Sequence, residues 1–262
     1  MKNPNPHLAA ACFVFGVISL APGQSAAAVL SGTVDTNPGN VLNLTTAGPD
    51  NWSIWHYTLA AVTPASTLVP SNRMSGAPGA GIPGYISDAF RVGGTAGATI
   101  RGGNGQTLDP TYTNGVSPIS ADITNIRMVF PSDLNSTGNG VGVSITGNPA
   151  QLYRISVWAS GLDGQGTMTA SSSGVDDVEL FSQSYGASGG DGQKAPTLFT
   201  FLFQPDNLAD VLTLQYVLST NDGGSSTSHV GISAVTVEAI PEPGFATLTG
   251  LGCLALLRRR CP

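Results

Sequence analysis

The long middle of this chain contains no cysteine. The three cysteines of the 262-residue sequence, Cys12, Cys253 and Cys261, all lie near the two chain ends. The middle therefore has neither a disulfide framework nor a cysteine metal site. Its stability has to come from packing and hydrogen bonding.

Charge is scarce as well, and basic charge is the scarcer kind. Only 10% of the residues are charged. Residues 29–239 contain six basic and fifteen acidic side chains, an excess of nine negative charges. Such a surface repels phosphate groups, so nucleic acid and anionic membrane surfaces are disfavoured as partners.

The usual motifs of catalysis are missing from this middle part. It has two histidines, His56 and His229, and no H-E-x-x-H, G-x-S-x-G or phosphate-binding loop. Nucleophilic, zinc and phosphoryl-transfer chemistry therefore lack their usual residues, and we expect no enzyme. A glycoside hydrolase needs only two carboxylates, so it stays open as a less favoured alternative.

Helical periodicity is absent too. The chain has 34 glycines and 18 prolines, and no apolar stretch of residues 29–239 keeps a 3.6-residue period for long. Apolar residues instead recur at every second position in short runs, which is typical of strands with one buried face. The predicted strands are 123–130, 141–145, 153–159, 198–203, 212–218 and 230–238. The pattern predicts an all-β fold, an antiparallel β-sandwich.

Polar, glycine-rich segments separate these runs. They are typical of turns and surface loops. The predicted loops are 73–80, 101–105, 160–166, 187–194 and 221–228.

The N-terminal segment, residues 1–28, has the parts of a secretory signal peptide. Lys2 precedes an apolar stretch at residues 8–20, and small residues follow at positions 25–28. We expect a signal helix that is removed during export. Cleavage after Ala28 satisfies the A-x-A rule through Ala26 and Ala28, and cleavage after Ala27 satisfies it nearly as well.

The C-terminal segment, residues 240–262, has three parts in a fixed order. Pro241, Glu242 and Pro243 come first, then an apolar run at residues 244–257, then Arg258, Arg259 and Arg260. The run has fourteen residues, or about 21 Å as a helix, whereas a membrane span needs roughly 20 residues. We expect a short hydrophobic helix whose arginines stay on the cytoplasmic side.

This tail resembles the PEP-CTERM sorting signal of Gram-negative bacteria. The resemblance covers about the last 23 residues and implies an exosortase as partner, an integral-membrane protease that recognises the PEP motif and removes the tail. It also implies transient anchoring in the inner membrane, followed by delivery to the cell surface or the exterior, often together with exopolysaccharide and biofilm production.

The order of segments in residues 29–239 resembles bacterial extracellular modules of the galactose-binding-like, jelly-roll kind. The matching segments are DNWSIWH at 50–56, SNRMSG at 71–76, LYRISVWASG at 152–161 and GTMTAS at 166–171. Residues between Gly76 and Asp122 depart from the pattern. The resemblance implies a jelly-roll-like β-sandwich, a fold that commonly binds glycans without catalysis.

Glycan binding requires exposed aromatic rings with polar groups nearby. The candidates are Trp52, Trp55, His56 and Trp158. The alternative is that these aromatic side chains pack in the hydrophobic core. Trp52 and Trp55 are three residues apart on a predicted strand, so they lie on opposite faces and we expect at least one to be buried. Trp158 faces away from Tyr153, Ile155 and Val157 and either packs under a loop or meets solvent.

Asp176, Asp177 and Glu179 form the densest acidic cluster. Their oxygens are suited to Ca²⁺, but no D-x-D-x-D-G pattern is present and a solvated acidic loop is the favoured interpretation. We expect no cofactor, with a structural Ca²⁺ as a weak alternative.

The sequence as a whole predicts an exported, non-catalytic protein of the cell surface or extracellular matrix. Two roles stay open. One is a carbohydrate-interacting module associated with exopolysaccharide, and the other is a structural or adhesive matrix protein without a small ligand.

Overall fold

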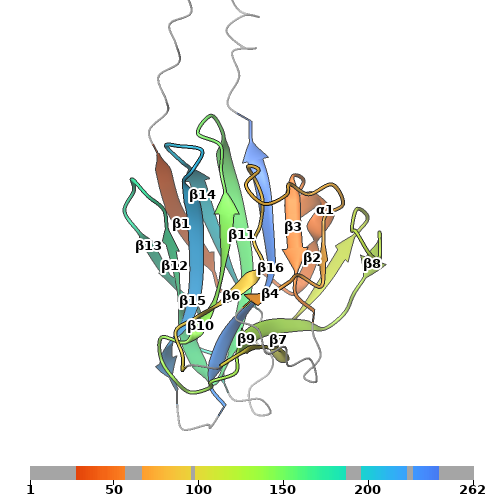
Figure 1. The fold of residues 1–262 in the computed structure, drawn as a ribbon. Coiled ribbons are helices and arrows are strands. Elements are labelled where there is room, and N and C mark those ends of the chain that lie inside the picture. The colour runs from red at the N-terminus through yellow and green to blue at the C-terminus, as the bar shows by residue number, and fades with distance from the viewer. Residues whose placement is uncertain (1–27, 57–66, 96–97, 187–195, 223–226, 242–262) are drawn as a thin grey trace, which may run out of the picture.

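The computed structural model describes residues 28–56, 67–95, 98–186, 196–222 and 227–241. Over these residues the chain is almost entirely β-structure, with one short helix, α1 (Leu44–Ala47). The strands form two curled sheets, so the all-β prediction is confirmed (Figure 1). The expected signal helix and sorting helix lie outside the described residues.

The larger sheet has ten strands and contains both the first and the last strand of the described chain. Its order is β1 (Val29–Asp35), β14 (Thr197–Gln204), β11 (Leu152–Leu162), β16 (His229–Ile240), β9 (Ile126–Pro131), β7 (Ile100–Tyr112) and β2 (Val41–Asn43), with β3 (Asn51–Ile54), β5 (Asn72–Arg73) and β8 (Ala121–Asp122) attached at its side. Its neighbouring strands are antiparallel to each other except β2 and β7, which run parallel.

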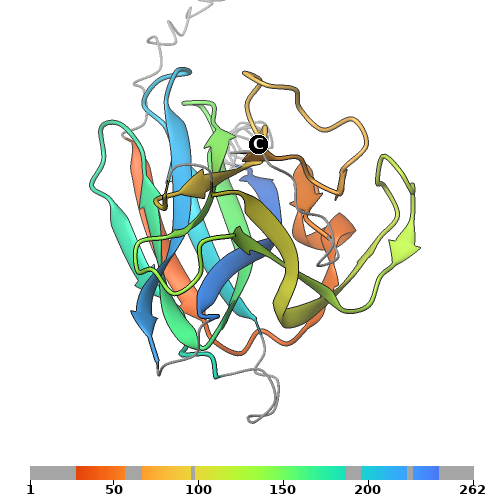
Figure 2. The ribbon, with the colours of Figure 1, turned by 60° about the horizontal axis from the view of Figure 1, so that its bottom comes forward.

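The smaller sheet has six strands, all antiparallel to their neighbours. Their order is β13 (Val178–Phe181), β12 (Gly164–Ser171), β15 (Val211–Asn221), β10 (Gly140–Thr146), β6 (Ala89–Val92) and β4 (Thr67–Leu68). Figure 2 shows how the strands of both sheets curl around a common interior.

The main core lies between the two sheets. Phe199, Phe201 and Phe203 of β14 face it from the larger sheet, and Leu212 and Leu214 of β15 face it from the smaller one. All five side chains are fully buried, which stabilises the fold by about 1.5–3 kcal/mol for each large apolar group. The period-two runs around these residues were predicted from the sequence and are confirmed.

A second, smaller core covers the outer face of the larger sheet. There the end of β7 returns with β2 and α1 over β3, β11 and β16. Of these elements, α1, β2 and β3 lie at the right of Figure 1. The buried members are Leu42, Leu44, Trp52, Ile54, Leu108, Tyr112, Ile126, Trp158 and Ala234. The central strands of the larger sheet are therefore buried on both faces.

Two predicted loops are wrong in part. Residues 101–105 lie within β7, because Arg101 pairs with Phe130 and Asn104 with Met128, and two register shifts interrupt the ladder around the glycines. Residues 160–162 belong to β11 and residues 164–166 to β12, so Asp163 is the single residue that connects the larger sheet to the smaller one. Its φ of 51° is a conformation that Asp tolerates better than most residues.

The two ends of the domain emerge side by side. Leu30 pairs with Phe203, Phe203 with Tyr153, and Tyr153 with Ala239, so one row crosses β1, β14, β11 and β16. Three strand spacings put the start of β1 and the end of β16 about 14 Å apart. Both lie at the top of Figure 1.

Candidate functional site

The last strand ends directly before the predicted sorting motif. β16 pairs as far as Ile240, opposite Leu152, one residue beyond the expected domain limit at 239. The amide Nε2 of Gln151 donates to the carbonyl of Ile240 at 2.6 Å, and the backbone N of Ala239 donates to Asp50 at 2.6 Å. Pro241 is exposed. The last described strand therefore ends one residue before Pro241, the first residue of the motif.

The other residues of the two predicted processing signals lie outside the described residues. These are Ala26, Glu242, Pro243, Arg258, Arg259 and Arg260. No helix among the described residues has the length and apolar character needed to cross a membrane. Ala28, the other predicted cleavage residue, is described and half-buried.

Trp52 and Trp55, two of the predicted glycan contacts, are fully buried. They lie on opposite faces of β3 and its extension, as predicted, with Trp55 in the main core and Trp52 in the second core. The indole N–H of Trp55 donates to the carbonyl of Leu68 at 3.1 Å, and that of Trp52 to Asn114 at 3.0 Å. Both rings are thus fixed within the protein and present no face to a ligand.

Trp158 is also an interior residue, with 7% of its surface exposed. The prediction that it faces away from Tyr153, Ile155 and Val157 is correct, but that face is covered by the second core. His56 alone of the four candidates is exposed. The structure does not bring the four side chains together at the surface, because both faces of the larger sheet are packed at this point.

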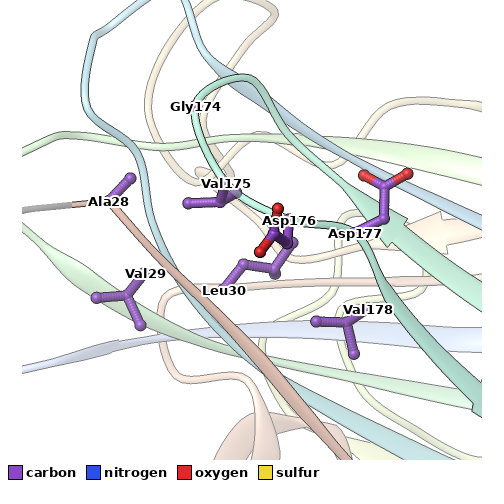
Figure 3. A pocket seen from close by; sticks show the side chains of 8 residues that line it. All are labelled: Ala28, Val29, Leu30, Gly174, Val175, Asp176, Asp177 and Val178. Atoms are coloured by element: carbon purple, nitrogen blue, oxygen red, sulfur yellow. The ribbon is translucent and has the colours of Figure 1, made fainter.

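An open cleft of about 710 Å³ lies at the end of the domain where β1 begins. Its lining comes from residues 28–30 and from the loop before β13, residues 174–178. Figure 3 shows the carboxylate of Asp176 over Leu30, while the carboxylate of Asp177 points to the other side of its segment. The cleft combines an apolar floor with carboxylates at its rim.

The acidic cluster does not converge on one point. Asp176, Asp177 and Glu179 are all exposed, and Glu179 lies on β13 outside the cleft lining. In the described part of the chain, no three His, Cys, Asp or Glu side chains are placed to hold a metal ion together. The weak Ca²⁺ alternative stays a prediction.

Tyr185 and Tyr216 are both fully buried. The Tyr185 hydroxyl lies 2.6 Å from Oγ1 of Thr197, and burial raises the pKa of Tyr185 to about 12. Burial also raises the pKa of Tyr216. Both phenols therefore stay neutral at ordinary pH. The burial of Tyr216 follows from its place on the buried face of the predicted strand 212–218. No alternating pattern around Tyr185 predicted that it would be buried.

His229 is the other histidine of the domain and is buried at the start of β16. Burial lowers its pKa to about 4. Nothing in the sequence around it distinguished it from a surface histidine, because its cover comes from Phe130 of β9.

Neither a family model nor a curated protein matches this chain.

Proposed function

We propose that this protein is an exported, non-catalytic protein of the cell surface or extracellular matrix, sorted through its PEP-CTERM-like tail. The observation that carries the proposal is the position of the two chain ends. β16 ends at Ile240, Pro241 is exposed, and the row from Leu30 to Ala239 puts the other end beside it. The end of β16 at the exposed Pro241 supports access of a protease to the predicted C-terminal site.

An exosortase-type membrane protease is the partner that this proposal requires. Pro241 and Pro243 impose extended geometry on either side of Glu242, and they lie just beyond the last paired residue of β16. A Pro-Glu-Pro sequence, which favours extended geometry around one carboxylate, is suited to a protease cleft. The arginines at the chain end would hold the tail at the inner membrane until it is removed.

A structural or adhesive role in the matrix is the first candidate for the mature domain. Burial of Trp52, Trp55 and Trp158 supports it, since a sugar-stacking platform needs exposed rings. A carbohydrate-interacting module is the second candidate, and the open cleft with Asp176 at its rim supports that one. A jelly-roll-like β-sandwich is the fold we propose for either role, since two curled sheets with a shared core are compatible with it.

The test is mass spectrometry of both termini of the extracellular protein, made in a host that has the cognate exosortase. The proposal expects a chain that begins near Ala28 or Val29 and ends near the PEP motif. Extracellular protein that still carries Arg258, Arg259 and Arg260 would contradict it.

The two roles separate in a second assay. Binding of the mature protein to host exopolysaccharide should weaken in Asp176→Asn if the cleft holds sugar. Asp122→Asn is a matched control, since Asp122 is an exposed carboxylate on β8, outside the cleft. No binding, or equal binding by both variants, favours the structural role.

A further inference from the structure

The beginning of β1 is held by a carboxylate from a distant loop. The backbone N of Ala28 donates a hydrogen bond to Oδ1 of Asp206 at 2.9 Å, across 178 positions of sequence. Asp206 lies two residues after Gln204, which pairs with Val29. The bond therefore continues the β1–β14 ladder past its last pair and fixes the nitrogen of Ala28 at the rim of the cleft.

Other acidic groups lie on the segments next to this contact. Gly174 faces the second oxygen of Asp206, since a Cβ built on Gly174 would lie 3.2 Å from Oδ2. Asp176 extends over the same cleft a few residues later (Figure 3). Asp210 ends the loop that begins after β14, and its oxygens accept from Ser173 and from the backbone N of Asn207.

These carboxylates have no cationic side chain beside them in the described ranges. The ion pairs found there, Arg73 with Asp88 and Arg154 with Glu238, use neither Asp176 nor Asp206. A peptide N–H offers Asp206 only a partial positive charge. A full positive charge on the same nitrogen would strengthen the bond and offset the repulsion among the carboxylates.

We propose that the chain is cut between Ala27 and Ala28, and that the ammonium group released on Ala28 forms an ion pair with Asp206 at the rim of this cleft. The cut is a hydrolysis by a signal peptidase of the host: one water is added, a carboxylate forms on Ala27 and an ammonium group forms on Ala28. The sequence leaves two cleavage positions open, and a cut after Ala28 would remove the nitrogen that Asp206 holds. The proposal rests on the export proposed above.

The first measurement is the N-terminal sequence of the protein secreted from the full precursor. We expect Ala28 as the first residue. A chain that starts at Val29 overturns this proposal and leaves export standing, whereas an uncut chain that starts at Met1 overturns both.

The second measurement tests the ion pair on the secreted protein. Only an unprotonated amine reacts with an N-hydroxysuccinimide ester, so an ion pair slows the labelling of the α-amino group. Lys2 and Lys194 are the two lysines of the sequence, so after cleavage Lys194 remains as an internal reference for the labelling rate. In Asp206→Asn the α-amino group should label about two- to five-fold faster relative to Lys194, the range that an exposed ion pair supports.

Asp177→Asn is the matched control. It removes the same charge from the same cleft, but its carboxylate points away from Leu30 (Figure 3). We expect the wild-type labelling rate in this variant. Equal rates in wild type, Asp206→Asn and Asp177→Asn would overturn the ion pair. Equal acceleration in both variants would overturn it as well, because the effect would then not depend on the contact with Asp206.

Discussion

The imidazole of His229 stacks on the phenyl ring of Phe130, with ring centroids 4.0 Å apart and an angle of 26° between the planes. Nδ1 of the imidazole contacts the carbonyl of Thr227, which can only accept, so the neutral ring carries its proton on Nδ1. Nε2 is buried and has no hydrogen-bond partner among the described residues. A second proton would therefore place a charged N–H in an apolar site, and burial lowers the pKa of His229 to about 4.

The burial of His229 predicts a loss of stability in mild acid. In the unfolded chain His229 has the ordinary pKa of about 6.5, so between pH 6.5 and 4 the unfolded state binds the extra proton. The contribution of His229 to the free energy of unfolding should therefore be fully present above pH 6.5. It should fall by up to about 3 kcal/mol as the pH drops to 4. Urea denaturation at pH 7 and pH 4.5 measures the difference.

The control for this prediction is a substitution of the exposed His56. Carboxylates titrate in the lower part of the same range, so the informative quantity is the difference between variants. His229→Gln should show a flatter pH dependence than wild type, and His56→Gln should keep the wild-type dependence. If His229→Gln and wild type lose stability in parallel, the histidine is not the cause.

The backbone of β16 passes unusually close to β9 at Gly231. A Cβ added there would lie 2.0 Å from the carbonyl oxygen of Val129. Both strands are central, so neither can move aside, and Gly231→Ala should lower the free energy of unfolding by about 3 kcal/mol or more. Gly79→Ala is the control, because an added Cβ there meets nothing closer than Ile82 at 4.0 Å; it should stay within about 0.5 kcal/mol of wild type. Thermal melts of both variants measure the contrast.

Asn72 joins the second core to the loop after β7. Its amide Nδ2 donates to the Tyr112 hydroxyl at 2.7 Å and to the carbonyl of Pro118 at 3.1 Å, and its Oδ1 accepts from the backbone N of Val116 at 3.2 Å. The side chain is buried, with 7% exposed. Asn72→Ala should cost about 2 kcal/mol, because it leaves buried polar groups without partners.

A double-mutant cycle isolates the bond between the two side chains. Asn72→Ala, Tyr112→Phe and the double variant should give a coupling free energy of about 1 kcal/mol. Thr124→Ala, a change at an exposed position, should be neutral. Additive effects of the two changes would mean that this hydrogen bond contributes nothing to stability.

Reducing agent should not change the stability of the exported domain. Residues 13–252 contain no cysteine, so the mature protein has no disulfide to lose. The melting temperature of the purified domain, ending at Pro241 so that the Leu152–Ile240 pair is kept, should be the same with and without dithiothreitol. A decrease with dithiothreitol would contradict the expectation that the domain is stabilised by packing and hydrogen bonds alone.

The sequence predicted burial well where neighbouring residues determine it, and poorly where a distant segment of the chain determines it. The run around Phe199, Phe201 and Phe203 alternates by itself, so its strand and its buried face follow from the residues alone. The burial of Trp158 has a distant cause: the end of β7 folds back over the outer face of β11. Periodicity assigns that indole to a face and cannot tell that the face is covered.

Glycine misled the sequence analysis at residues 101–105. Glycines usually indicate turns, but here they lie in β7 at register shifts, where Gly102 pairs with Val129 before the ladder is interrupted. The cleft at the start of β1 was not predicted either. It is lined by residues 28–30 and 174–178, which are far apart in sequence, so no local pattern contains it.

The last prediction separates folding from sorting at Glu242. The final pair of β16 is Ile240 with Leu152, and the exposed Pro241 follows, so Glu242→Ala should leave the melting temperature of the domain unchanged. If a protease recognises the carboxylate between its two prolines, unprocessed precursor should accumulate at the inner membrane. Glu238→Ala is the control: that carboxylate bonds Arg154 at 2.6 Å on the strand itself, so its loss should leave processing at the normal rate. Normal trimming of Glu242→Ala in a host with the cognate exosortase would mean that the tail is not recognised through this motif, and the proposed sorting route would lose its main support.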